Sequence, residues 1–177
     1  MSDPPAGVGR IFLIGTNTND LRVLAYESQP YAQSELLISN LTDSARFNSK
    51  GEIAFTACVK ANSPNCIDSL WRNSLSPGTD FTFYGQSLDG AKVTGIAYNS
   101  TKDADFEFNN DGNMVVELGL EGRGDALVFL AKNNSMTLLA ETGKPLPGAP
   151  SPVDFFGDVE LAQSGNLFLF AGRISRR

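Results

Sequence analysis

One hairpin pattern occurs three times along this chain and restricts the folds that it can adopt. A strand that ends at Phe47 leads through a turn at Gly51 into the apolar stretch 53–59. The same order of residue types surrounds Gly112 and Gly165, which follow 61 and then 53 residues later. A strand, a glycine turn and a second strand repeated at this distance indicate a repeat protein, in which each unit packs on its neighbours.

Two further strands and a breaker loop complete each unit. Phe12, Trp71 and Phe129 stand at matching places in the third strands, 59 and 58 residues apart. The third and fourth strands are predicted at 10–15 and 21–26, at 69–72 and 80–84, and at 128–131 and 136–140. The breaker loops are 27–30, 85–90 and 143–148, and the variable linkers that follow them are 34–44, 91–104 and 149–160.

The predicted fold is all-β, with three four-stranded, blade-like repeats of about 57 residues in a single domain, 1–177. The units span approximately 45–90, 104–148, and 158–177 joined with 10–30, so the repeats are circularly offset against the chain. Four strands per unit favour a β-propeller. Three units are fewer than propellers use, and two associated chains would supply six units. A β-trefoil or a β-prism is the alternative, and so is a piece of a longer chain.

The last predicted strand indicates that the chain either closes on its own first strand or associates with another chain. The segment 167–171 is almost wholly apolar, and an open edge of this kind is a template for aggregation. We therefore expect it to be covered by strand 10–14, either of the same chain or of a neighbouring chain.

Charge and missing residue types exclude several classes of function. The chain has 20 Asp and Glu against 14 Lys and Arg, and its net charge of −6 disfavours nucleic acid, because phosphate contacts need clustered cations. No apolar run approaches the roughly 18 residues of a membrane span, and the first nine residues do not have the pattern of a signal peptide. The absence of His removes the commonest general base and metal ligand, so we expect no enzyme, no cofactor and no metal site.

Two stretches have the composition of ligand loops. Residues 109–113 carry alternating oxygen-bearing side chains, as calcium loops do. The matching turn carries Lys50, which would repel a cation, and Asn, Asp and Gly are also what hairpin turns require. The glycine-rich run 118–124 lacks the Gly-Lys-Ser/Thr ending of a phosphate loop. We interpret both stretches as hairpin connections.

The segment Phe47-Asn48-x-x-Gly51-x-Ile53-Ala54-Phe55 and the loop 138–148, Leu-Leu-Ala-Glu-Thr-Gly-Lys-Pro-Leu-Pro-Gly, resemble the tandem blade repeats of secreted bacterial propeller proteins. The resemblance covers 10–173 and implies a blade architecture, but the activity of those proteins is unknown. The chain departs from the pattern in its three units and at Ser28, which stands where the other breaker loops have glycine.

Four tyrosines, Tyr26, Tyr31, Tyr84 and Tyr98, lie near breaker loops and linkers. Loops on a rigid scaffold are where binding residues concentrate, although these tyrosines could equally well only cover the loop surface. The predicted function is a non-catalytic extracellular binding or assembly module for glycan or protein partners. The alternative is a carboxylate-based, glycosidase-like hydrolase with a propeller pocket, since a pair of carboxyl groups at a set separation suffices for that chemistry.

The two cysteines bear on the compartment. Cys58 and Cys66 flank a short loop between the second and third strands of one unit, and we predict that a disulfide joins them. Two buried thiols are the alternative. A disulfide requires an oxidising compartment, so the predicted location is extracellular or periplasmic.

If Cys58 and Cys66 are bonded, reduction raises the intact mass by two hydrogens. The melting temperature falls by several degrees, because closing so short a loop stabilises by about 2–3 kcal/mol. Intact-mass spectrometry and thermal unfolding with and without reductant measure both effects. Two thiols that react with an alkylating agent in the native, non-reduced protein would contradict the prediction.

Overall fold

The computed structural model describes residues 11–14, 22–28, 37–60, 67–73, 79–82, 86–97, 106–149, 151–166 and 168–174, and these contain strands and turns but no helix. The strands are β1 (Ile11–Ile14), β2 (Arg22–Tyr26), β3 (Leu37–Phe47), β4 (Ile53–Lys60), β5 (Ile67–Asn73), β6 (Thr79–Thr82), β7 (Ser87–Leu88), β8 (Ala91–Ile96), β9 (Phe106–Phe108), β10 (Met114–Leu120), β11 (Gly124–Leu130), β12 (Met136–Glu141), β13 (Val153–Leu161) and β14 (Phe168–Ile174). The prediction of an all-β fold is confirmed.

Within these ranges, no helix has the length and apolarity that crossing a membrane requires.

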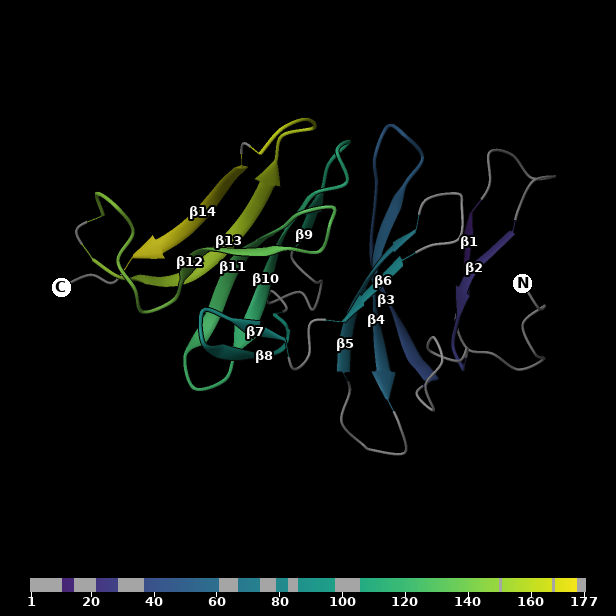
Figure 1. Ribbon diagram of the computed structural model, residues 1–177, viewed down its shortest axis with the longest axis horizontal. Coiled ribbons are helices and arrows are strands. Elements are labelled where there is room, and N and C mark those ends of the chain that lie inside the picture. Colours follow the sequence, from purple (N-terminus) through teal and green to yellow (C-terminus); the bar gives the residue numbers. More distant parts are fainter. Residues whose placement is uncertain are drawn as a thin grey trace.

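The strands form four antiparallel sheets that follow one another across the molecule (Figure 1). β1 and β2 make a hairpin at one end, and β13 and β14 make a hairpin at the other end. Between them lie a four-stranded sheet of order β3-β4-β5-β6 and a six-stranded sheet of order β12-β11-β10-β8-β7, in which β9 also pairs with β10. The outer strands β7 and β12 of the six-stranded sheet contact each other, so this sheet is curled into a half-barrel.

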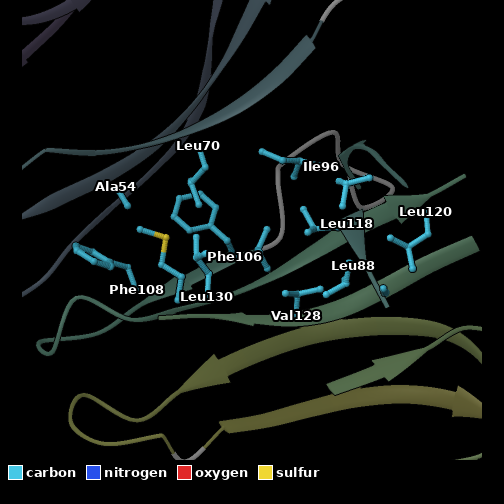
Figure 2. Close-up of a cluster of buried hydrophobic side chains, with 14 of the residues drawn as sticks. Ala54, Leu70, Leu88, Ile96, Phe106, Phe108, Leu118, Leu120, Val128 and Leu130 are labelled. Carbon is cyan, nitrogen blue, oxygen red and sulfur yellow. The ribbon is translucent and has the colours of Figure 1, made fainter. Parts of the chain in front are cut away.

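The largest core cluster fills the space between the two central sheets. Ala54 of β4 and Leu70 of β5 point from the four-stranded sheet toward Phe106, Leu118 and their neighbours in the six-stranded sheet (Figure 2). Side chains along a strand alternate between its two faces, so every second residue of β10 and β11 enters this cluster. The contact between the sheets is therefore made face to face.

The opposite faces of the same strands are buried as well. Val115 of β10 and Leu127 of β11 pack against Val153, Phe156 and the rest of a cluster contributed by β13. On the far side of the four-stranded sheet, Phe55 belongs to a separate cluster that also contains Ile38, Ile53 and Ala57. Burial on both faces explains why β10 carries apolar side chains on both faces, with Glu117 as its one charged residue, instead of alternating apolar and polar ones.

The variable linkers, to which the sequence pattern assigned no strand, contain strands. β3, β8 and β13 lie largely within 34–44, 91–104 and 149–160. Ser, Thr, Asp and Pro interrupt the apolar pattern of these stretches, and register shifts within β3 and β13 interrupt their period of two. Pairing with a strongly apolar neighbour, β4 or β14, holds β3 and β13 in the extended conformation.

The β1–β2 hairpin, which contains Phe12, matches the β11–β12 hairpin. Its alignment differs from the one that the spacing of aromatic residues predicts. β1–β2 and β11–β12 each have a one-residue shift, between Phe12 and Leu13 and between Leu127 and Val128. This aligns Phe12 with Leu127, whereas the spacing of aromatic residues had aligned it with Phe129. Among the described strands, β1–β2 and β13–β14 form separate two-stranded sheets, which lie at opposite ends of the molecule (Figure 1). The predicted unit 158–177 joined with 10–30 stays a prediction.

The breaker loops after these two hairpins share one backbone contact. The N–H of Ser28 donates to the carbonyl of Ile38 at 2.7 Å, and the N–H of Gly143 donates to the carbonyl of Val153, also at 2.7 Å. Ser28 has φ = 71° and Gly143 has φ = 79°, so both residues are in the left-handed region. A side chain is unfavourable there, which explains why glycine is the residue of the later loop.

Exchanging the two residue types therefore has opposite effects on stability. Ser28→Gly removes left-handed strain and stabilises the fold by up to about 1 kcal/mol, whereas Gly143→Ser destabilises it by about 1 kcal/mol. A Cβ at Gly143 has no atom within 4 Å, so backbone strain alone is tested. Urea unfolding of both variants measures the change. Effects of the same sign would show that the loops do not hold matching conformations.

Candidate functional site

A buried asparagine organises the hairpin turn between β9 and β10. Oδ1 of Asn109 accepts hydrogen bonds from the backbone N–H groups of Asp111 at 3.0 Å and Asn113 at 2.9 Å. The N–H of Gly112, at φ = 80°, donates to the Asn109 carbonyl at 3.1 Å. The Asn109 side chain is completely buried, and its oxygen satisfies two turn amides that no strand partner reaches.

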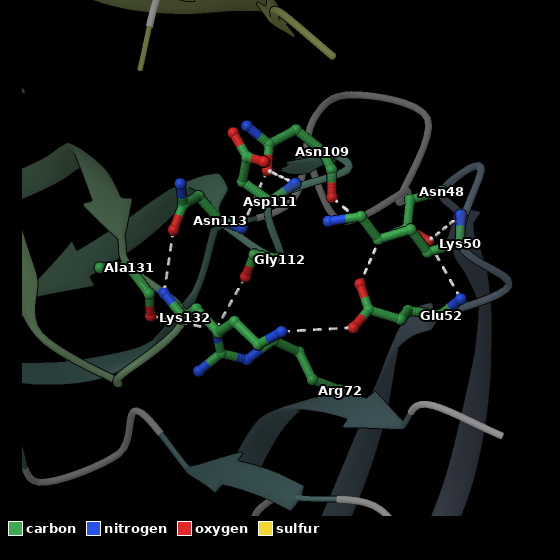
Figure 3. Close-up of polar contacts among 10 residues, drawn as sticks. All are labelled: Asn48, Lys50, Glu52, Arg72, Asn109, Asp111, Gly112, Asn113, Ala131 and Lys132. Carbon is green, nitrogen blue, oxygen red and sulfur yellow. Dashed lines mark hydrogen bonds and ion pairs between the residues drawn. The ribbon is translucent and has the colours of Figure 1, made fainter. Parts of the chain in front are cut away.

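Asn48 repeats this arrangement in the turn between β3 and β4 (Figure 3). Its Oδ1 accepts from the N–H groups of Lys50 at 3.1 Å and Glu52 at 3.0 Å. Its Nδ2 donates to the backbone carbonyl of Asn109 at 3.0 Å, which ties the first turn to the second. Each asparagine therefore closes its own turn with its oxygen and bonds the next turn with its nitrogen, and Nδ2 of Asn48 also donates to the Glu52 carboxylate of its own turn.

The third turn, between β13 and β14, continues the contacts. Nδ2 of Asn109 donates to the carbonyl of Gly165 at 2.9 Å, and the N–H of Gly165 donates to Oδ2 of Asp111 at 2.7 Å. Ala162 stands where the other turns have asparagine, so the series of side-chain donors stops there. We call the three turns, 48–52, 109–113 and 162–166, the turn cluster.

Arg72 of β5 adds a buried cation to the turn cluster (Figure 3). Its Nη1 donates to the carbonyls of Gly112 at 3.1 Å and Ala131 at 3.0 Å, so it joins the four-stranded sheet to the six-stranded one. Burial lowers the pKa of Arg72 from its ordinary value, and the negative charge of Glu52 acts in the opposite direction. Glu52 also pairs with Lys132 at 3.5 Å.

These contacts decide what the turn cluster can do. The side-chain oxygens that a calcium loop would direct at a cation accept backbone N–H groups instead. In the described ranges, no group of three or more His, Cys, Asp or Glu side chains is arranged to hold a metal. The turn cluster connects adjacent sheets, and the interpretation of 109–113 as a hairpin connection agrees with the geometry.

A hollow lies at the other end of β10, where the breaker loop 143–148, which follows β12, approaches the β7–β8 turn. Its volume is about 360 Å³. We call it the loop hollow, and its lining residues are Asp89, Arg123, Leu138, Leu139, Ala140, Glu141, Lys144, Pro145, Leu146 and Pro147. Leucine and proline side chains form much of its wall, and charged groups from three segments meet in it.

Arg123 joins the charged groups of the loop hollow. Its guanidinium binds the Glu141 carboxylate with Nε at 2.9 Å from Oε1, and Nη2 contacts Oε2 of the same group. Nη2 also lies 3.2 Å from Oδ2 of Asp89, and Nη1 donates to the Asp89 carbonyl at 2.8 Å. One arginine thus fixes the turn after β10, the end of β12 and the turn after β7 against one another.

This pairing sets the chemistry that the two carboxylates can perform. The hydrogen bond from Arg123 lowers the pKa of Glu141, although the burial of this carboxylate acts in the opposite direction. The same bond raises the pKa of Arg123. A glycosidase needs one carboxyl group whose pKa is raised so that it can donate a proton. Glu141 is shifted the other way, so the ion pair serves positioning instead of proton transfer.

The structure describes one of the four tyrosines predicted to bind ligand. Tyr26 ends β2, and only 8% of its surface is exposed. Tyr31, Tyr84 and Tyr98 lie outside the described residues. The binding role of the four tyrosines therefore stays a prediction.

One cysteine of the predicted disulfide is described. Cys58 is buried on β4, with its Sγ 2.8 Å from Oγ of Ser39. Cys66 lies outside the described residues, so no disulfide joins two residues within the described ranges and the bond stays a prediction.

Sequence reasoning missed the residues of the loop hollow. It interpreted 118–124 correctly as a hairpin connection, because β10 and β11 pair in continuous register across it. It gave no role to Arg123 within that connection. The conspicuous signal is a lone arginine among glycines, and nothing in the spacing indicates that Asp89 and Glu141 approach it.

Comparison with known proteins gives one result. Residues 8–177 match a family model described as a family of unknown function, DUF7453. No curated protein and no solved structure matches the chain.

Asn109 is expected to be the most sensitive residue of the turn cluster. Asn109→Ala removes two bonds within the turn and one to Gly165, and it leaves buried groups unsatisfied, so we expect a loss of roughly 2–4 kcal/mol of unfolding free energy. Asn109→Asp keeps the acceptor but loses the donor and is also destabilising. Urea unfolding measures both.

Asn133→Ala is the matched control. Asn133 is exposed, and its Oδ1 bonds only Ser135, at 3.1 Å through the N–H and 2.8 Å through the hydroxyl. We expect its loss to cost less than about 1 kcal/mol. Equal costs at Asn109 and Asn133 would show that contacts between turns do not stabilise the fold.

Proposed function

The chain belongs to the DUF7453 family, and we propose that it is a non-catalytic binding module that presents loops on a rigid scaffold of β-hairpins. The observation that carries the proposal is the loop hollow. Three segments from distant parts of the sequence converge there, and Arg123 fixes their relative positions with charge-assisted hydrogen bonds. Preformed concave surfaces of this kind are where small ligands and partner segments bind.

The lining of the loop hollow favours a protein partner over a glycan. Leu138, Leu139, Leu146 and the prolines offer apolar contact, while Asp89 and Lys144 provide charge at exposed positions. Sugar rings commonly stack on aromatic side chains, and no aromatic residue lines this hollow. Protein interfaces commonly combine apolar contact with polar and charged groups in this way.

The pairing of both carboxylates with Arg123 makes the hydrolase the weaker alternative. A hydrolytic site needs one carboxyl group free to exchange a proton with substrate. In the loop hollow the pKa of Glu141 is lowered, and Asp89 shares the same arginine.

The proposal includes a propeller-type arrangement of blade-like repeats. Its support is the recurrence of whole hairpins: the Asn48 and Asn109 turns have the same hydrogen bonds, and Ser28 and Gly143 bond matching carbonyls. Adjacent sheets also pack face to face, as the blades of a propeller do. An extracellular or periplasmic location is proposed with it and depends on the Cys58–Cys66 disulfide.

Selection of binding peptides tests the proposal. Peptides chosen from a random display library against the whole protein are expected to lose at least tenfold in affinity when Lys144→Glu reverses a charge in the loop hollow. Lys50→Glu makes the same charge reversal in the turn cluster, which lies at the opposite end of β10 from the loop hollow, and is expected to leave binding unchanged.

The same preparation is applied to a glycan array and to chromogenic glycosides. Binding that Lys144→Glu and Lys50→Glu weaken equally would refute the loop hollow as the site. Glycan binding without peptide binding would refute the protein partner, and glycoside turnover abolished by Glu141→Gln would establish the hydrolase instead.

A further inference from the structure

The charged groups of the loop hollow form a series in which the sign of the charge alternates. Arg123 binds the carboxylate of Asp89 on one side and the carboxylate of Glu141 on the other. Lys144 follows in the turn after β12, where its backbone N–H donates to the Glu141 carbonyl at 3.2 Å. The series therefore has a negative end at Asp89 and a positive end at Lys144.

The two inner groups of this series are already engaged within the chain. Arg123 directs Nε and Nη2 at Glu141, and Nη1 and Nη2 at Asp89, so each nitrogen of its guanidinium has a partner. Glu141 is buried, with 5% of its side chain exposed. A ligand that paired with either group would break the charge-assisted bonds that hold the three segments in place.

The two end groups are open to a ligand. The side chain of Asp89 is 65% exposed, and its contact with Arg123 is made through Oδ2. Lys144 is exposed as well, and its ammonium forms no ion pair with any residue that the structure describes. A ligand can therefore pair with both ends while the bonds of Arg123 stay intact.

The apolar wall of the loop hollow lies along the edge of β12. Leu138 packs against the cluster between the two central sheets, whereas Leu139 packs against the cluster on the opposite face. Both line the hollow, and successive side chains point to opposite faces of a sheet, so the hollow follows the strand edge. Its 360 Å³ is near the lower end of the roughly 300–1,000 Å³ of ligand pockets, which suits a few residues of an extended chain.

We propose that the loop hollow binds a short extended segment of a partner protein with a defined order of charge. An apolar residue of the segment contacts the leucine wall, an acidic residue beside it pairs with Lys144, and a basic residue on its other side pairs with Asp89. A segment of the reverse order would bring like charges together at both ends, so the hollow accepts the segment in one direction. This inference rests on the proposed function and adds the chemistry of the partner.

Selection from a displayed library of random linear peptides tests the charge order. Peptides selected on the intact protein are expected to share an apolar residue with an acidic residue on one side and a basic residue on the other, always in the same direction. Selected peptides in which the two charges occur in both orders, or in neither, would overturn the inference.

A charge exchange tests the pairing with Lys144. Lys144→Glu is expected to weaken the binding of a selected peptide about tenfold, and a peptide whose acidic residue is replaced by lysine is expected to recover most of that loss. Lys50→Glu is the matched control and is expected to bind both peptides as the unaltered protein does. Isothermal titration calorimetry measures the affinities, and thermal unfolding verifies that each variant is folded. A lack of recovery with the exchanged peptide would refute the pairing.

Asp89→Asn tests the negative end. This variant keeps the backbone carbonyl that Arg123 bonds and a side-chain oxygen, and it removes the negative charge. We expect weaker binding of the selected peptide and no change for a peptide whose basic residue is replaced by glutamine. An equal loss for both peptides would show that Asp89 does not recognise the basic residue.

The outcomes separate this inference from the proposed function. Peptides that Lys144→Glu weakens more than Lys50→Glu does, but that share no charge order and show no recovery on charge exchange, would leave the loop hollow as the site and refute the inference. Binding that both variants weaken equally, or no peptide binding at all, would refute the proposed function and this inference with it.

Discussion

The rest of the structure depends on burying both faces of the two central sheets. No hairpin here encloses a core of its own, because a two-stranded ribbon has too little apolar surface to be stable in water. The central strands β4 and β10 therefore send alternate side chains into clusters on either side. Since neighbouring sheets share two of these clusters, the hairpins are stable only in series, as in other repeat proteins.

The turn cluster provides what face-to-face packing does not, namely the relative alignment of the sheets. Apolar contact is non-directional and would tolerate sliding of one sheet on the next. The buried amide of Asn48 and that of Asn109 each bond a carbonyl of the following turn, and Arg72 does the same from β5. Any sliding would leave these polar groups buried without partners, which is costly. Arg123 has the same effect at the opposite end of β10.

The loop hollow belongs to the loops around the six-stranded sheet, whose relative positions Arg123 fixes. In repeat proteins the scaffold is fixed by nearest-neighbour contacts, while the loops vary independently.

The sequence by itself determined the all-β class, the three glycine turns and the hairpins beside them, because these depend on local chemistry. Gly112 takes positive φ, Asn109 bonds its own turn, and β10 is long and apolar enough to be recognised without its partners. Only the tertiary structure decided that the linkers contain β3 and β13, whose extended conformation comes from pairing with β4 and β14. It also decided that Arg123 meets Asp89 and Glu141, since residues 34 and 18 positions apart meet only after the sheets have packed. Turn preferences are properties of a few neighbouring residues, whereas strand pairing and ion pairing are properties of the folded arrangement.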